Sequence, residues 1–145
     1  MFIKYFFGFS LLALVALAQA AETNNSAVID LSKLLKMDQL LEKVATSQVI
    51  FIGESHDRYD HHLNQLAIIK SKHESEDQLA IGLEFIQQPF QSTLDDYIAG
   101  NIDEAALLEG THYFDRWGYD FRLYRPIFSY AREHGIPLIA LKIDR

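Results

Sequence analysis

Three short apolar runs alternate with more polar stretches along the chain, and this alternation predicts strands separated by helices. The predicted strands are Val49–Ile52, Leu79–Phe85 and Pro137–Leu141. Each run is apolar at consecutive positions, which is typical of strands that are buried on both faces of a parallel sheet. We therefore expect an α/β fold in which a parallel sheet is flanked by helices.

The stretches between the strands predict helices, because residues that are usual at helix ends flank them. Pro89 and Pro126 stand in first turns, and Gly100, Gly110 and Gly135 follow last turns. The predicted helices span residues 30–45, 60–73, 89–99, 103–108 and 124–134. An aromatic-rich loop, residues 113–124, joins the last two of these helices.

The sheet predicted in this way is incomplete. The chain ends directly after its third predicted strand, and a three-stranded parallel sheet without a further covering element would expose apolar surface. We expect either that the chain is the N-terminal part of a longer domain, which we favour, or that a partner completes the sheet.

The first residues have the order of a secretory signal peptide. Lys4 precedes the apolar run Leu11–Leu17, and the small-residue pattern Ala18-Gln19-Ala20 follows it. The alternative is an uncleaved N-terminal anchor, for which the apolar run is short. We therefore expect residues 1–20 to be a signal peptide, residues 21–47 a linker and helix, and residues 48–145 the α/β domain.

The length, the net charge and the lack of cysteine exclude several classes of function. The 145 residues correspond to at most one domain, and a formal net charge of -7 makes nucleic acid an unexpected partner. The chain has no cysteine, which excludes disulfides, thiolate metal sites and thiol catalysis. The lack of a cysteine also excludes a lipid anchor attached through a cysteine. Together with the predicted signal peptide, this leads us to expect a periplasmic or exported protein.

Polar residues with catalytic chemistry gather where two predicted strands end. Glu54 and His56 follow the first strand, and Glu84 stands near the end of the second. Ligands bind beyond the carboxyl ends of parallel strands, so these side chains should meet there. At 100° per residue, His62 faces the same way as the apolar side of its helix, whereas His61 faces away. Such a cluster could ligate a metal, act as acid and base, or hold polar groups of a cofactor, although each residue alone is more often structural.

The aromatic-rich loop holds six aromatic residues among its 12 positions. It could form a hydrophobic lid or minor core, or a flat apolar pocket wall. A phenolate is a known axial ligand of haem iron, and arginines pair with carboxylates such as haem propionates. The candidate arginines are Arg116, Arg122 and Arg125.

Several ordered motifs resemble one known family. They are Val49–Asp57 (VIFIGESHD) with His61, His62 and Gln65, then Ile81–Phe85 with Gln91, Leu94, Asp95, Tyr97 and Gly100, and then Trp117, Tyr119, Phe121, Tyr124, Pro126 and Ile127 with the Gly135–Pro137 turn. Together they resemble the ChaN-like haem-binding uptake family and, more distantly, the Tiki proteases and erythromycin esterases.

The resemblance implies an α/β haem-binding protein of iron acquisition, periplasmic or associated with the outer membrane, that dimerises around haem with tyrosine ligation. The distantly related enzymes use Glu and His at the positions of Glu54, His56 and Glu84. Family members are usually longer, an Asn usually follows the last strand where Lys142 stands, and lipoprotein members carry a cysteine after the signal.

We therefore expect an envelope protein that binds haem for haem or iron uptake. In this interpretation Glu54, His56, His62, Glu84, Tyr119 and Tyr124 bind haem, and the two tyrosines are equal candidates for the iron ligand. A second copy of the chain and an envelope receptor or transport protein are the expected partners. One alternative is a hydrolase in which Glu54, His56 and Glu84 are catalytic, with a divalent metal. Another is a truncated, inactive remnant.

Export gives the first test. Cleavage between Ala20 and Ala21 is expected, because the signal order ends there. Mass spectrometry of the protein from the envelope fraction should find Ala21 at the N-terminus, and retention of Met1 would contradict the prediction.

Overall fold

The computed structural model describes residues 34–75 and 78–143. The predicted signal peptide and its cleavage site lie outside these residues. The chain divides into the units Met1–Leu34 and Leu35–Arg145, and the fold described below belongs to the second. None of the helices in the described ranges is long and apolar enough to cross a membrane.

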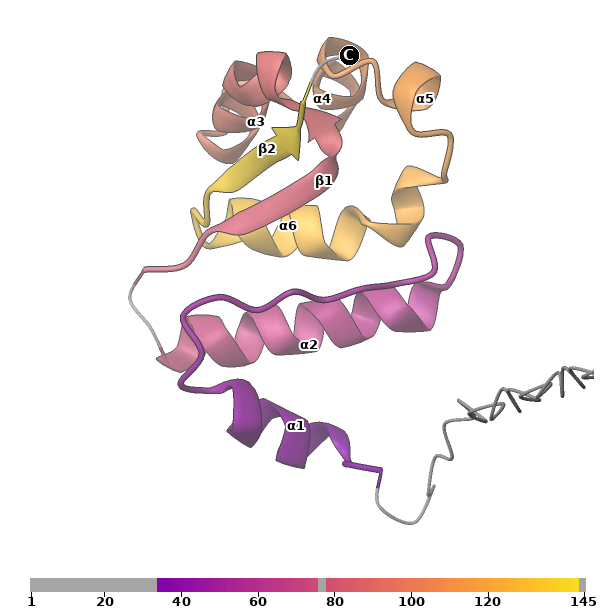
Figure 1. Cartoon of the computed structure of the whole chain (residues 1–145). Coiled ribbons are helices and arrows are strands. Elements are labelled where there is room, and N and C mark those ends of the chain that lie inside the picture. Colours follow the sequence, from indigo (N-terminus) through magenta and orange to yellow (C-terminus); the bar gives the residue numbers. More distant parts are fainter. Residues whose placement is uncertain (1–33, 76–77, 144–145) are drawn as a thin grey trace, which may run out of the picture. The chain divides into compact units, whose positions relative to one another are not determined.

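Helices and two strands follow each other along the second unit (Figure 1). In chain order they are α1 (Met37–Val44), α2 (Tyr59–Ser75), β1 (Ile81–Gln87), η2 (Gln88–Phe90), α3 (Gln91–Ile98), α4 (Glu104–Gly110), α5 (Tyr113–Arg116), η3 (Phe121–Leu123), α6 (Arg125–Glu133) and β2 (Leu138–Lys142). The predicted helices are thus present with shifted ends. The aromatic-rich loop was expected to be irregular, but it contains α5 and η3.

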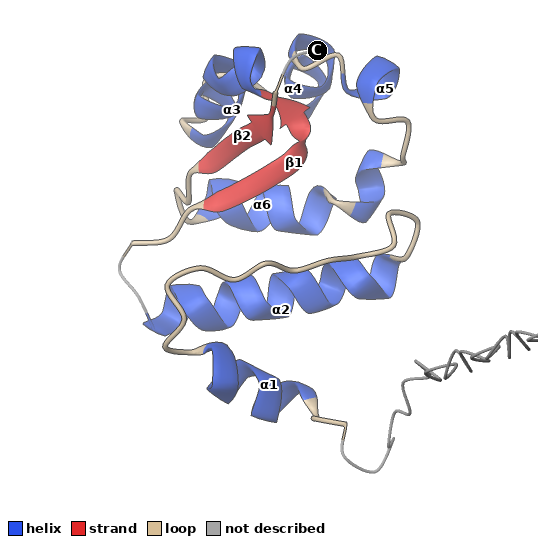
Figure 2. Cartoon of the chain, viewed as in Figure 1, coloured by secondary structure: helices blue, strands red, loops and turns tan. Residues whose placement is uncertain are grey.

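The two strands pair in parallel, with Ile81 opposite Leu138 and Leu83 opposite Ala140. The connection between them runs through the helices α3 to α6, which confirms the α/β class (Figure 2). The side chain of Gln91 in α3 bonds to the backbone of β2: its Nε2 donates to Leu138 O at 2.8 Å and its Oε1 accepts from Ala140 N at 2.7 Å. This amide thereby satisfies two backbone groups of β2 as a further strand would.

The predicted strand Val49–Ile52 is not part of the sheet, and this prediction was wrong. Within the described residues the sheet has two strands, and the segment 48–54 runs extended alongside α2 instead (Figure 1). Side chains of α2 hold it there: Gln65 Nε2 donates to Ile52 O at 3.2 Å, and Lys72 Nζ donates to the O atom of Ser47, just before the segment, at 3.1 Å. A crevice of about 520 Å³ is lined by this segment and by β1.

The core lies between the sheet and the helices α3 to α6. Phe128 of α6 is 1% exposed, and its ring lies 6.3 Å from that of Phe85, 6.2 Å from that of Tyr97 and 5.0 Å from that of Phe121. These rings come from β1, α3, η3 and α6, so their packing joins the elements that position the site. Three of the six aromatic residues of the aromatic-rich loop belong to the same core, because Tyr113, Phe121 and Tyr124 are buried.

Substitution of Phe128 tests this core. Phe128→Ala should lower the free energy of unfolding by about 3–5 kcal/mol, because it removes a buried ring and leaves a cavity. Urea unfolding measures the loss. Phe51→Ala is the matched control: its side chain is 95% exposed in the extended segment, and its loss should cost less than about 0.5 kcal/mol. A large cost at Phe51 would show that the segment packs into the sheet after all.

Candidate functional site

A buried carboxylate lies at the centre of the candidate site. The Glu54 side chain is 7% exposed, and its Oε1 lies 2.5 Å from His56 Nδ1. Tyr124 donates its hydroxyl hydrogen to the same oxygen at 3.3 Å. The second oxygen, Oε2, lies 3.9 Å from His62 Nε2 and has no hydrogen-bond partner among the described residues. Glu54 is therefore anchored through one oxygen, while the other retains its capacity to bind.

His62 stands in the first turn of α2 and faces Glu54, in the direction that its helical phase predicts. It is 1% exposed, and its ring lies 4.3 Å from the ring of Tyr124. Its Nδ1 lies 3.2 Å from Gln65 Oε1, and Gln65 in turn bonds to Ile52. The i, i+3 spacing of His62 and Gln65 could have revealed this pair, but the sequence reasoning did not assign Gln65 a role.

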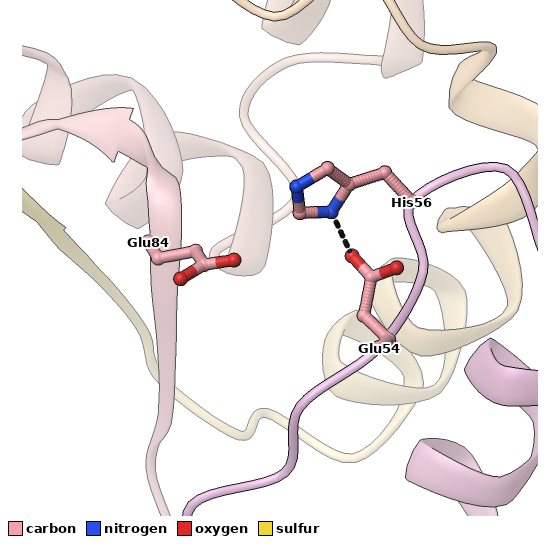
Figure 3. A group of neighbouring side chains, drawn as sticks. All are labelled: Glu54, His56 and Glu84. Atoms are coloured by element: carbon pink, nitrogen blue, oxygen red, sulfur yellow. Dashed lines mark hydrogen bonds and ion pairs between the residues drawn. The ribbon is translucent and has the colours of Figure 1, made fainter.

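Glu84 approaches the same centre from the sheet. It stands within β1, which continues to Gln87, so the expectation that it lies at a strand end was wrong. Its exposed carboxylate points from the strand toward His56 and Glu54 (Figure 3). One ligand atom from each of these three residues lies within 4.8 Å of the others. A nitrogen and two carboxylate oxygens form a donor set that suits a divalent cation.

Aromatic rings flank the other side of His56. Its ring centre lies 4.5 Å from that of Trp117 and 5.0 Å from that of Tyr119. Trp117 stacks on Phe85 of β1 at 5.0 Å, and Lys142 Nζ lies 5.9 Å from its ring centre. His56 is therefore held between carboxylates and aromatic rings, with a cation nearby. No sequence pattern indicated a role for Lys142.

The two candidate tyrosines occupy different environments. Tyr124 is 3% exposed, and its hydroxyl accepts a hydrogen bond from Trp117 Nε1 at 3.0 Å while donating to Glu54. Burial raises the pKa of Tyr124; the Trp117 hydrogen bond opposes this, and the charge of Glu54 adds to it. Tyr119 is 37% exposed. Tyr124 is thus a neutral phenol that links Trp117 to Glu54, whereas the ring of Tyr119 is partly exposed at the surface.

Two of the three arginines expected to face a ligand are paired with acids of this chain. Arg122 binds Asp120 and lowers the pKa of that carboxyl to about 2. Arg125 Nε donates to Glu104 at 2.8 Å. Arg116 bonds to Gln87 and lies over the ring of Phe90. A carboxylate ligand would compete with Asp120 and Glu104 for the first two cations.

Comparison with known proteins gives one match. The sequence model of a protein family described as "Haem-binding uptake, Tiki superfamily, ChaN" matches residues 40–145, which is more than half of the chain. Neither the curated proteins nor the solved structures contain a match.

The alkaline pH dependence of stability tests the buried state of Tyr124. Because its pKa is raised above the ordinary value of about 10, the folded chain holds the phenol proton more tightly than the unfolded chain does. Stability is therefore fully present below about pH 10 and falls as the pH rises through the folded pKa. Tyr97, Tyr113 and Tyr130 have raised pKa values too, so the wild-type fall combines several groups.

Tyr124→Phe removes one of these groups. Above about pH 10 the free energy of unfolding, measured with urea, should fall less steeply with pH in the variant than in the wild type. The difference in slope should be up to about 1.4 kcal/mol per pH unit. At neutral pH it should be less stable by about 1 kcal/mol, because Trp117 and Glu54 lose a shared partner. An unchanged alkaline slope would mean that this phenol ionises as readily in the folded chain as in the unfolded one.

Proposed function

Because the chain belongs to the ChaN-like haem-binding uptake family of the Tiki superfamily, we propose that it binds haem as cargo for uptake across the cell envelope. The export signal expected in residues 1–20 favours the periplasm as its location. A second copy of the chain and an envelope receptor or transport protein are the partners that this role calls for.

One observation carries the proposal: an exposed phenol stands beside a histidine and an indole, and the indole stacks on a ring that lines an apolar crevice. Tyr119 packs against His56 and Trp117, with ring centres at 5.0 and 5.3 Å. Phe85, on which Trp117 stacks, lines a crevice of about 520 Å³ together with Ile127, Tyr124 and Glu54. Its volume is within the range of small-molecule pockets.

These residues fit haem in three respects. The aromatic rings offer flat apolar surface to a porphyrin. Ferric iron is a hard ion that suits the anionic oxygen of Tyr119, as phenolate ligation of haem shows. Lys142, whose Nζ lies 5.9 Å from the Trp117 ring centre, is a cation that could pair with a propionate.

The different environments of the two tyrosines support a choice between them, which the sequence left open. The phenol of Tyr124 is already bonded to Glu54 and Trp117, and its raised pKa disfavours the phenolate. We therefore propose Tyr119 as the iron ligand, and we assign Tyr124 to positioning Glu54.

A second candidate function rests on the donor set of Glu54, His56 and Glu84, whose ligand atoms lie within 4.8 Å of one another. In this alternative a divalent cation held by these residues would activate water for hydrolysis. Glu84→Gln separates the two functions. It should remove metal-dependent hydrolysis of an ester or peptide if the alternative holds, and it should preserve the tyrosine-ligated haem spectrum.

Haemin titration followed by absorbance tests the proposed function. The wild-type protein should show a shifted Soret band and a tyrosinate-to-iron charge-transfer band. Tyr119→Phe keeps the ring and removes the oxygen, so the charge-transfer band should disappear and affinity should fall by at least about tenfold, the lower end of losses seen when metal sites are weakened.

The controls are two other tyrosines. Tyr124→Phe should retain the charge-transfer band, and Tyr59→Phe, at an exposed position of α2, should bind as the wild type does. Loss of the band in Tyr124→Phe with its retention in Tyr119→Phe would reverse the assignment. A wild-type protein without any Soret shift would refute haem binding.

A further inference from the structure

A second cluster of ligand-forming side chains lies at the far end of α2 from Glu54. It consists of His73, Tyr130 and His134, and its members come from the last turn of α2 and from the end of α6. These two helices contact each other and end on the same side of the fold (Figure 1). His62 stands in the first turn of α2, so about 16 Å of helix separates it from His73.

The two histidines of this cluster are held through the same ring atom. His134 Nδ1 lies 2.9 Å from Tyr130 O, and His73 Nδ1 lies 2.9 Å from the Tyr130 hydroxyl. A carbonyl only accepts, so Nδ1 of His134 carries the hydrogen, and Nε2 of the neutral ring carries the lone pair. The hydroxyl can likewise accept from Nδ1 of His73. Metal-binding histidines are typically held in this way, by a hydrogen bond from the ring nitrogen that does not bind the metal.

The two imidazoles are also close to each other and to open space. Their ring centres lie 5.0 Å apart, with ring planes at 81°. Both line an open hollow of about 440 Å³, together with backbone and side chains around Leu79 and Ile136. Within the described residues, every hydrogen bond of these two rings uses Nδ1, which leaves both Nε2 atoms for a ligand.

Charges of both signs surround the cluster. Glu74 and Glu133 are the chain neighbours of the two histidines, and their negative charges add to the burial that raises the pKa of Tyr130. Lys70 acts in the opposite sense, with its Nζ 5.3 Å from the Tyr130 ring centre. Neutral imidazole is a preferred ligand of Zn²⁺, Ni²⁺ and Cu²⁺, and Cu²⁺ binds most tightly to such nitrogen donors.

We propose that His73 and His134 form a second binding site, for a divalent transition-metal ion that imidazole nitrogens prefer, with water completing the coordination. This site is separate from the cluster of Glu54, His56 and Glu84 and does not depend on haem binding. Tyr130 is its positioning residue, because it holds both rings through its hydroxyl and its carbonyl oxygen.

Calorimetric titration with Cu²⁺ and Zn²⁺ tests the proposal on the purified protein. His73→Gln and His134→Gln should each weaken one binding event by at least about tenfold, and the double variant should abolish it. His112→Asn is the matched control: its histidine is exposed and lies outside both clusters, and Asn tolerates the positive φ of 50° at that position. The His56→Ala/Glu84→Gln variant should keep the event, which assigns it to the second site.

A measurement on the unsubstituted chain guards against misfolded variants. Sub-stoichiometric Zn²⁺ should shift the imidazole NMR signals of His73 and His134 together, and the electron paramagnetic resonance spectrum of bound Cu²⁺ should show coupling to two nitrogens. If neither histidine signal moves, or if the His73→Gln/His134→Gln protein binds both ions as the wild type does, the cluster only packs α2 against α6 and the proposal fails.

Discussion

The burial of one carboxylate, Glu54, governs how the candidate site is built. A carboxylate that is 7% exposed loses most of its hydration, which costs several kcal/mol unless other groups replace the water. His56 from the same loop and Tyr124 from the start of α6 replace this water, and Trp117 donates a hydrogen bond to Tyr124 in turn. The end of α5 and the start of α6 are therefore tied to a single charged group, and His62 in the first turn of α2 lies 3.9 Å from its other oxygen. Removing any partner would leave the charge or its donors unsatisfied.

The sequence predicts the parts of the fold whose signals are local. β1 and β2 lie within two residues of their apolar runs, and proline and glycine mark the helix ends closely. The run Val49–Ile52 carries the same signal as the true strands, yet it lies outside the sheet. Gln65 holds it along α2 through the carbonyl of Ile52, and Lys72 binds the carbonyl of Ser47 just before the run; nothing in the apolar run itself reveals these distant donors. Local pattern therefore predicts an extended segment, and tertiary contacts decide its pairing.

The same distinction applies to the site. The helical phase of α2 was sufficient to predict that His62 faces Glu54, because this phase depends only on residue spacing. The sequence could not separate Tyr119 from Tyr124, since both belong to one aromatic pattern and differ only in burial. That difference arises because Tyr124 precedes α6 and its ring packs 4.8 Å from that of Phe85, whereas Tyr119 follows a glycine in an exposed turn. Residue spacing is therefore sufficient to identify the candidate residues, whereas packing determines how their environments differ.

A protein that carries a cargo has to release it, and the arrangement of the two tyrosines is compatible with this need. Among the described residues Tyr119 contacts its neighbours through its ring, at 5.0 Å from His56 and 5.3 Å from Trp117, and its hydroxyl takes no part in the bonds that anchor Glu54. A ligand bound by Tyr119 would thus come and go without breaking the buried network. Binding through Tyr124 would instead remove a partner from Glu54 and Trp117, so part of each binding free energy would be spent on disrupting the core. If Tyr119 is the ligand, as proposed, binding and the buried hydrogen bonds of Glu54 are separate, so the ligand can bind without disturbing the fold.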